Sequence, residues 1–235
     1  MRAVILAGGK GTRLAPYTTA FPKPLVPVGD MPILEIVVRQ LVAAGVTRIT
    51  LAVGHLAELI RAYFTAHELA EVIEYSHESA PLGTVGPLAQ IPKLDAPFLV
   101  MNGDVLTTLD YRELIAYHGE HGGWLTIASH ERRVDIDFGI LQPGGGQTIV
   151  DYLEKPTHTY RVSMGIYVFD PRVLAYIPRG RRLDFPDLVK ALLADGRPVV
   201  AYPFDGVWLD IGRPDDYARA NEIFEQTRGA LIPKR

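Results

Sequence analysis

Residues near the start of the sequence combine glycines with two cations. The stretch LAGGKGTRLAPYTTAFPKPL, residues 6–25, has glycines at positions 8, 9 and 11, followed by Arg13 and by Lys23 between two prolines. Glycines let backbone N–H groups approach anionic oxygens closely, because no Cβ intervenes and positive φ is accessible. A guanidinium suits the phosphates of a triphosphate or a departing pyrophosphate. The pattern predicts a phosphate-binding loop, with a strand-to-loop turn carrying two solvated cations as the alternative.

Two familiar phosphate-binding motifs do not fit this stretch. A P-loop requires G-x-x-x-x-G-K-[ST], and no lysine followed by Ser or Thr stands in that position. A dinucleotide fingerprint requires G-x-G-x-x-G; Gly9 and Gly11 match it, but position 14 is Leu14. The remaining pattern is G-x-G-T-R followed by P-K-P.

A carboxylate suited to a metal ion follows a buried run further along the chain. Asp104 ends the segment NGD directly after the apolar residues 98–101. Mg²⁺ prefers carboxylates and phosphate oxygens in octahedral geometry. Asp104 is therefore a candidate Mg²⁺ ligand, and a cap of a turn or helix is the alternative.

The elements that must position these residues alternate along the chain. Continuous apolar runs and period-two patterns predict strands, and apolar residues recurring every three or four positions predict helices. The predicted strands cover residues 3–7, 49–53, 72–75, 98–101, 124–129, 139–141, 149–153, 162–169, 199–202 and 207–209. The predicted helices cover 56–65, 110–118 and 185–194, with a further one from an Asp30 N-cap to Gly45 and a last one from Pro214.

This order favours an α/β protein with a mostly parallel, Rossmann-like sheet covered by helices on both faces and a small antiparallel insertion. We expect a single domain over residues 1–235. In such sheets, ligands bind beyond the carboxyl ends of the strands. Residues 8–13, residues 83–86, Asp104 and Asp210 all follow predicted strands or lie near their ends, so we expect them to share one pocket.

The chain resembles the sugar-1-phosphate nucleotidyltransferases, also called nucleoside-diphosphate-sugar pyrophosphorylases. The segment LAGGKGTRL…PKPL matches the signature of that family. The resemblance continues in order through PLGTVGPL at 81–88, NGD at 102–104, FG at 138–139, EKP at 154–156, MGIYVF at 164–169 and WLDIG at 208–212.

The resemblance implies transfer of a nucleoside monophosphate from a nucleoside triphosphate to a sugar-1-phosphate, with release of pyrophosphate and with Mg²⁺ as cofactor. The version of residues 81–88 looks more like that of the guanylyltransferases, so mannose-1-phosphate guanylyl transfer is the first expectation. Uridylyl, thymidylyl or heptose-1-phosphate guanylyl transfer is the alternative, as is a catalytically silent nucleotide-sugar-binding regulatory subunit. Residues 1–125 would bind the nucleotide, and residues 126–235 would bind the sugar phosphate and include the last helix.

The resemblance also implies roles for individual residues. The catalytic residues would be Arg13, Lys23 and Asp104. The nucleotide would be held by Leu6, Ala7, Gly8, Gly9, Gly11, Thr12, Arg13, Lys23, Gly83, Thr84, Gly86 and Asn102. The sugar phosphate would be held by Gly139, Glu154, Lys155, Ser163 and Gly165, and the metal by Asp104 and Asp210. Many relatives have asparagine where this chain has Ser163, which leaves the sugar open.

Two other groups of residues predict solvated surface rather than a site. His118 and His121 stand three apart at the end of a predicted helix, where solvated cations are favoured over a metal pair. Arg179, Arg181 and Arg182 form a basic cluster in a loop, for which a solvated turn is the default reading.

Composition restricts the remaining classes of partner. The 235 residues carry a formal net charge of −3 and no cysteine. No broad basic surface for nucleic acid is expected, and disulfides and thiolate sites are excluded. Because no apolar stretch approaches the roughly 18 residues that span a bilayer, we expect a cytoplasmic protein without a membrane partner. We further expect no hexapeptide-repeat β-helix, and a homo-oligomer is possible.

Overall fold

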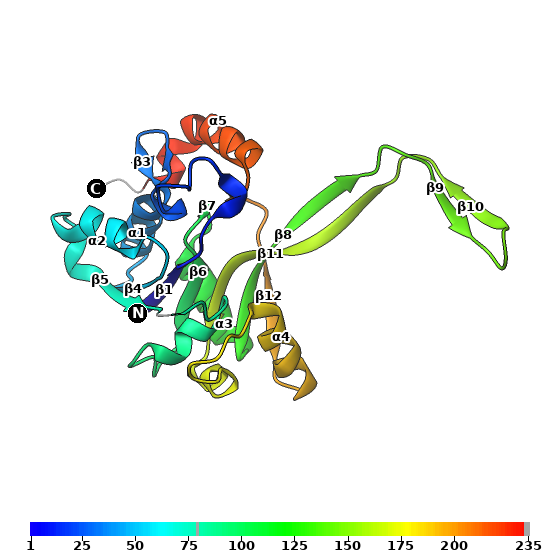
Figure 1. Ribbon diagram of the computed structural model, residues 1–235. Coiled ribbons are helices and arrows are strands. Elements are labelled where there is room, and N and C mark those ends of the chain that lie inside the picture. Colours follow the sequence, from blue (N-terminus) through cyan, green and yellow to red (C-terminus); the bar gives the residue numbers. More distant parts are fainter. Residues whose placement is uncertain (79, 233–235) are drawn as a thin grey trace.

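A seven-stranded sheet runs through the protein in the order β12–β8–β11–β6–β1–β4–β5 (Figure 1). The computed structural model describes residues 1–78 and 80–232. In sheet order, the strands are Val199–Pro203 (β12), Leu125–Asp135 (β8), Thr157–Phe169 (β11), Phe98–Asn102 (β6), Arg2–Ala7 (β1), Arg48–Val53 (β4) and Ile73–His77 (β5). All pairs are parallel except those of β11, which runs antiparallel to both β6 and β8.

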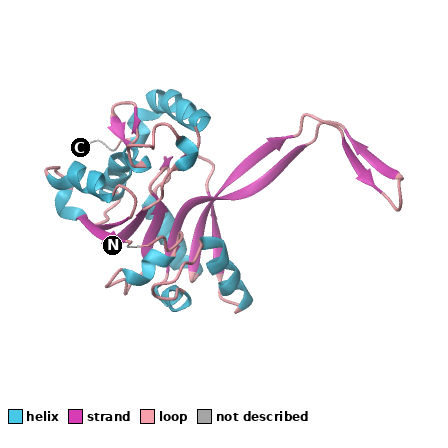
Figure 2. Ribbon diagram, in the orientation of Figure 1, coloured by secondary structure: helices cyan, strands magenta, loops and turns pink. Residues whose placement is uncertain are grey.

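Helices cover both faces of this sheet (Figure 2). The helices are Ile33–Ala43 (α1), Ala57–Thr65 (α2), Tyr111–His121 (α3), Phe185–Ala194 (α4) and Pro214–Leu231 (α5). Side chains alternate along β1, so that Ile5 packs in a core cluster with α1, α2, α3 and α5, while Val4 packs in a second cluster with α4 and the 3-10 helix Gly86–Gln90. This arrangement confirms the predicted mostly parallel, helix-covered fold.

Two predicted helix starts had different outcomes. Asp110 caps α3, because its carboxylate accepts from the backbone N–H of Arg112 at 2.8 Å. Asp30 does not cap α1, whose N-cap is Pro32. Asp30 instead accepts from the Arg228 guanidinium of α5 at 2.7 Å, so the aspartate joins two elements rather than starting one.

The prediction of a solvated cation at His118 is wrong. His118 is buried, and its Nδ1 lies 2.8 Å from the hydroxyl oxygen of Thr126 on β8. The helix extends one turn beyond the predicted end, to His121. His121, in the last turn, is exposed and stacks on Tyr117, with ring centroids 3.7 Å apart.

A two-stranded arm extends away from the sheet (Figure 1). The strands β8 and β11 run well beyond the predicted residues 124–129 and 162–169, and they stay paired out to Asp135 opposite Thr157. Beyond that pair, Ile140–Pro143 (β9) and Ile149–Leu153 (β10) form the predicted antiparallel hairpin. We call residues 130–162 the arm.

A short ladder connects the sheet to the last helix. Val105–Thr107 (β7), which the sequence did not predict, pairs antiparallel with Trp208–Asp210 (β13), placing Asp210 opposite Val105. Pro27–Val28 (β2) and Met31–Pro32 (β3) form another short pair before α1. Within the described residues, no helix has both the length and the apolar character needed to cross a bilayer.

Candidate active site

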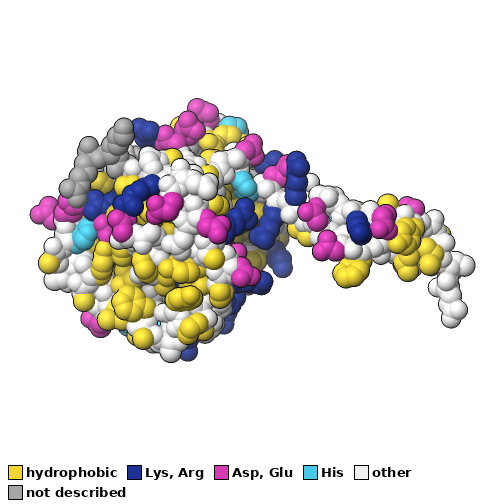
Figure 3. All heavy atoms as spheres, turned by 90° about the horizontal axis from the view of Figure 1, so that it is seen from above, with side chains coloured by type: hydrophobic (Ala, Val, Ile, Leu, Met, Phe, Trp, Pro, Cys, Tyr) yellow, Lys and Arg dark blue, Asp and Glu magenta, His cyan; other side chains and the backbone are white. Residues whose placement is uncertain are grey.

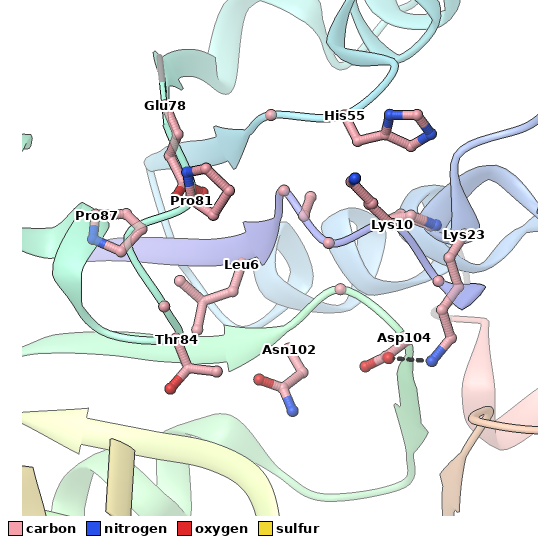
Figure 4. A pocket seen from close by; sticks show the side chains of 18 of the residues that line it. Leu6, Lys10, Lys23, His55, Glu78, Pro81, Thr84, Pro87, Asn102 and Asp104 are labelled. Carbon is pink, nitrogen blue, oxygen red and sulfur yellow. Dashed lines mark hydrogen bonds and ion pairs between the residues drawn. The ribbon is translucent and has the colours of Figure 1, made fainter. Parts of the chain in front are cut away.

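A cavity of about 700 Å³ lies at the carboxyl ends of β1, β4, β5 and β6 (Figure 4). This is the edge of a parallel sheet where ligands bind in α/β proteins. The predicted nucleotide-binding and catalytic residues that line it are Leu6, Ala7, Gly8, Gly9, Gly11, Thr12, Arg13, Lys23, Gly83, Thr84, Asn102 and Asp104. Segments far apart in the sequence therefore meet in one cavity.

The glycine-rich loop after β1 is held in shape by its neighbours. Gly11 adopts φ 61° and begins the 3-10 helix Thr12–Leu14, while Thr18 donates its hydroxyl to the Gly11 carbonyl at 2.8 Å. Leu14 is buried and donates its N–H to the same carbonyl at 2.9 Å. Leu14, where a dinucleotide motif would have its third glycine, thus anchors the loop to the core.

Lys23 points into the cavity from the other side of the loop. It begins the 3-10 helix Lys23–Leu25, is buried, and forms an ion pair with Asp104 (Figure 4). Pro22 and Pro24 restrict the backbone on either side of it. The lysine is therefore held at a defined position beside the carboxylate.

Asp104 and Asp210 form a pair of neighbouring carboxylates. Asp210 lies opposite Val105 in the β7–β13 ladder, and the Ile211 N–H donates to the Asp104 carbonyl at 3.1 Å. Burial raises the pKa of Asp210, the Asp104 charge raises it further, and Lys23 opposes both effects. These contacts bring together the two residues predicted to hold a metal.

This pair fits Mg²⁺ as a partner. One carboxylate oxygen of Asp104, Oδ1, is buried without a hydrogen-bond partner in the described part of the chain. No cluster of three or more metal-ligating side chains occurs among the described residues. Mg²⁺ often binds one or two carboxylates and takes its remaining ligands from substrate phosphates and water. Asp104 and Asp210 would supply the protein's share of such a site.

The loop of residues 81–86 is clamped by the segment that precedes α4. The N–H groups of Val85 and Gly86 donate to the Leu183 carbonyl at 3.1 and 3.3 Å, and the Phe185 N–H donates to the Thr84 hydroxyl at 2.7 Å. Gly83 has φ 79°, and a Cβ there would lie 2.5 Å from the Leu183 carbonyl oxygen.

The two glycines of this loop therefore differ in their surroundings. Gly83 lies in the cavity wall with Thr84. Gly86 lies behind the wall, where a Cβ would be 3.0 Å from the Arg181 carbonyl oxygen. The structure gives Gly86 a packing role that allows the loop to approach residues 181–183.

Glu78 and Arg182 also line the cavity, and the sequence did not single out either as a site residue. Glu78 follows β5 and accepts from the Leu82 N–H at 3.0 Å, and burial raises the pKa of its carboxyl group. Its Oε1 approaches Gly8 so closely that a Cβ on Gly8 would lie 2.4 Å away. Its position just beyond a predicted strand was the signal that could have identified it.

Arg182 belongs to the cluster for which a solvated turn was the default prediction. Its guanidinium pairs with Asp184 at 3.0 Å, and both side chains border the cavity. Lys10 and His55 also line the cavity, on the side that carries Lys23 (Figure 4). The cavity thus carries more cationic groups than the motifs alone indicated.

Two of the predicted sugar-phosphate residues lie at the base of the arm. Gly165 has φ 75°, and a Cβ there would lie 2.6 Å from the Asn102 amide nitrogen, so this glycine allows β11 to approach the cavity wall. Ser163 donates its hydroxyl to the Tyr167 phenol at 3.3 Å. Gly165 therefore adjoins the cavity wall, whereas the hydroxyl of Ser163 contacts Tyr167 of the same strand.

The other three predicted sugar-phosphate residues lie on the arm, away from the cavity. Tyr152 joins two of them: its phenol donates to Glu154 at 3.0 Å, and a Cβ on Gly139 would lie 2.0 Å from the phenol oxygen. Lys155 follows with a left-handed backbone, at φ 42°. Among the described residues, none of the arm lines the cavity.

Comparisons with known proteins agree with this geometry. A family model described as nucleotidyl transferase matches residues 2–227. A mannose-1-phosphate guanyltransferase of Aspergillus fumigatus is 35% identical over 227 residues, covering 92% of this chain and 62% of that protein. The mannose-1-phosphate guanylyltransferase catalytic subunit beta of Danio rerio is 34% identical and covers 100% of this chain and 68% of its own length. The chain thus spans less than two thirds of the fungal relative.

Solved structures of similar proteins share this fold. HddC from Yersinia pseudotuberculosis, crystallised with GMP-PN, aligns with a TM-score of 0.73 at 27% identity, covering 95% of this chain and 99% of that one. A glucose-1-phosphate thymidylyltransferase of Bacillus anthracis, described as putative, aligns with a TM-score of 0.74 at 24% identity, covering 95% of this chain and 94% of its own.

Proposed function

The chain belongs to the nucleotidyl transferase family, and we propose that it transfers a nucleoside monophosphate from a nucleoside triphosphate to a sugar-1-phosphate, releasing pyrophosphate. Guanosine triphosphate and mannose-1-phosphate are the first substrate pair that we propose, because the Aspergillus fumigatus and Danio rerio relatives are named for it. The observation that carries the proposal is the convergence of Arg13, Lys23, Asp104 and the glycine-rich loop in one cavity.

This reaction brings two polyanions together, so positioning and charge neutralisation account for most of the catalysis. The sugar-phosphate oxygen is already ionised and attacks the α-phosphorus directly, forming one P–O bond as the bond to pyrophosphate breaks. Arg13 and Lys23 would neutralise the triphosphate and the departing pyrophosphate. No side-chain nucleophile is needed.

Lys23 would have to exchange partners when the nucleotide binds. In the structure its ammonium group pairs with Asp104. Phosphate oxygens beside Lys23 would draw the ammonium group toward them and free the Asp104 carboxylate. Mg²⁺ bound by Asp104 and Asp210 would supply positive charge at the α-phosphate.

Glu78 favours guanine as the base. A carboxylate only accepts hydrogen bonds, and guanine presents two neighbouring donors, the N1–H and the N2 amino group. Thymine and uracil present an N–H between two carbonyl oxygens, which a carboxylate would repel. Because Glu78 borders the cavity next to Gly8 and residues 81–84, we place the base there.

Purified protein with Mg²⁺ should release pyrophosphate only when a triphosphate and a sugar-1-phosphate are both present. The assay should screen GTP, UTP, dTTP and ATP against mannose-, glucose- and heptose-1-phosphates. Asp104→Asn should lower the rate by about 1,000-fold or more, since losing roughly 4 kcal/mol of transition-state stabilisation has that effect. Asp95→Asn, in the loop at the opposite end of β6, is the matched control and should keep the wild-type rate.

The outcomes separate the proposal from its rival. Turnover with one pair, lost in Asp104→Asn alone, supports the transferase. Nucleotide or nucleotide-sugar binding without turnover for any pair would overturn the enzymatic proposal in favour of a regulatory nucleotide-sugar-binding protein. A near-normal rate in Asp104→Asn would remove this carboxylate from the site.

A further inference from the structure

Among residues 1–78 and 80–232, nothing packs against the outer part of the arm. Figures 1 and 2 show the β8–β11 ribbon and the β9–β10 hairpin leaving the sheet with no helix or third strand beside them. Neither core cluster includes a residue of the arm. A two-stranded ribbon is marginally stable in water unless one face is covered. The arm therefore requires a covering surface.

The exposed side chains of the arm are apolar to an unusual degree. Seven of the twelve large hydrophobic side chains that are exposed in the described residues belong to it: Val134, Phe138, Leu141, Ile149, Val150, Tyr152 and Tyr160. Phe138 and Val150 are 77% and 70% exposed. Figure 3 shows apolar side chains gathered on the outer part of the arm. Such a patch marks an interaction surface.

The same arm carries three of the five residues expected to bind the acceptor. Gly139 and Glu154 meet at Tyr152, and Lys155 lies next to them, while the cavity is built from the body of the molecule. Within one chain, the described structure leaves these groups and Arg13 in separate places. Among the described residues, the cavity of one chain thus lacks three of the five groups expected to bind the acceptor, including the cation Lys155.

We propose that two copies of this chain exchange arms, so that the arm of each copy covers the cavity of the other and supplies Glu154 and Lys155 to it. This inference rests on the proposed function. Lys155 would neutralise the acceptor phosphate, and Glu154 would accept hydrogen bonds from sugar hydroxyls. The two sites of the dimer would be composite, each built from both chains.

A second copy suits the arm better than an unrelated protein. Each copy has one uncovered arm and one incomplete cavity. In a two-fold symmetric dimer, each arm would be covered by the partner copy, and each cavity would be completed by the partner's arm. The body offers an apolar counterpart beside the cavity: Tyr17 and Phe21 are each about half exposed, at 52% and 51%, on the loop that carries Arg13 and Lys23. Phe138 and Val150 of the arm would pack against such a surface.

The stiffness of the ribbon argues against the arm folding back on its own cavity. Residues 157–163 of β11 pair with residues 135–129 of β8 in unbroken register. Bending the ribbon within this stretch would break backbone hydrogen bonds, each contributing about 1 kcal/mol; the register shift of the ladder lies at its base, between Ser163 and Tyr167. Reaching a second copy requires no such break.

Cross-linking tests the exchange without relying on activity. The chain has no cysteine, so Lys155→Cys in one preparation and His55→Cys in another introduce one thiol each. His55 borders the cavity. A bismaleimide should join the two variants into a covalent dimer when they are mixed. The double variant in one chain should also give dimers, whereas a cross-linked monomer would show that the arm closes on its own chain and would overturn the proposal.

Complementation tests the composite site directly. Asp104→Asn and Lys155→Ala should each be inactive alone, and co-expression should restore about a quarter of the wild-type rate, because half of randomly formed dimers contain one intact composite site. No recovery, with an active wild type, would overturn the exchange.

The molecular mass in solution separates this proposal from the proposed function. The wild type should have twice the mass of the monomer. The double variant Phe138→Ser, Val150→Thr should have a lower average mass, closer to that of the monomer. A cross-linked dimer without turnover for any substrate pair would keep the exchange and reject the transferase. A monomeric wild type would reject the exchange and leave the transferase untouched.

Discussion

At the scale of single residues, the site brings charged side chains close together, both an ion pair of opposite charges and two neighbouring carboxylates. Lys23 is buried against Asp104, Asp104 lies beside Asp210, and burial raises the pKa values of both Asp210 and Glu78. Such groups lower the stability of the empty protein and become favourable when a polyanion, a metal ion or a base supplies the missing partner.

Glu78→Gln should change both base preference and stability. The discrimination of GTP over UTP, measured as the ratio of kcat/KM values, should fall by about 10- to 100-fold, because a good bidentate pair contributes roughly 1–3 kcal/mol. The Glu78 pKa is raised above its ordinary value of 4.5 in the folded protein, so its ionisation destabilises the fold as the pH rises above 4.5.

The ligand-free Glu78→Gln variant should therefore melt at a higher temperature than the wild type at pH 7.5, and the gap should narrow toward pH 4. Glu71→Gln, an exposed change just before β5, is the control and should alter neither property. An unchanged nucleotide ratio would remove Glu78 from base recognition.

At the scale of elements, α3 is attached to the sheet through a buried histidine. His118 packs between α3 and β8 beside Thr126, with Asp170 and Arg172 as its charged neighbours. Burial lowers the His118 pKa, the Asp170 charge raises it and the Arg172 charge lowers it, with burial the largest effect. The neutral imidazole is therefore favoured in the folded protein.

The stability of this contact should depend on pH. Below the unfolded value of about 6.5, the unfolded chain binds a proton at His118 that the folded chain resists, so stability falls as the pH falls from 7 toward 5. His118→Asn removes the group that takes up this proton. The free energy of unfolding should then fall less steeply with decreasing pH, by at most about 1.4 kcal/mol per pH unit. Melting temperatures recorded from pH 5 to 8 measure this difference, and His121→Asn, at an exposed position, is the control. If the melting temperatures of His118→Asn and of the wild type fall in parallel, His118 is not the source of the pH dependence.

At the scale of the whole molecule, the protein divides into a helix-covered sheet and an arm outside both core clusters. The edge of the sheet supplies the cavity, and the arm carries Glu154 and Lys155. Folding of the sheet and completion of the site therefore depend on different parts of the chain.

Removal of the arm should leave the sheet folded. Glu131 and Arg161 are register partners, so an Asn-Gly turn can replace residues 132–160 without changing the ladder. The shortened protein should unfold cooperatively within about 5 °C of the wild type, a shift equivalent to roughly 1–2 kcal/mol for a domain of this size. It should bind GTP in calorimetry, whereas loss of cooperative unfolding would show that the arm belongs to the core.

The sequence by itself determined the class of the sheet, the carboxyl end of β1 and the glycine-rich loop that follows it. The apolar run of residues 3–7 predicted a strand buried on both faces, and the glycines, Arg13 and Lys23 follow its end within a short stretch of chain. Local patterns of this kind are encoded over a few residues, which is why twelve predicted residues, from Leu6 to Asp104, line the cavity, while Gly86 lies behind its wall and Glu78 was not predicted.

Only the tertiary structure decided how distant segments meet. The predicted strands 124–129 and 162–169 correspond to the parts of β8 and β11 that lie within the sheet. The sequence did not indicate that the two strands stay paired out to Asp135 and Thr157. This longer pairing places Glu154 and Lys155 on the arm rather than in the cavity. Glu78 and Arg182 reach the cavity through the register of β5 and the clamp on residues 81–86. Pairing and packing between remote segments depend on the sum of many weak contacts, which no short pattern in the chain records.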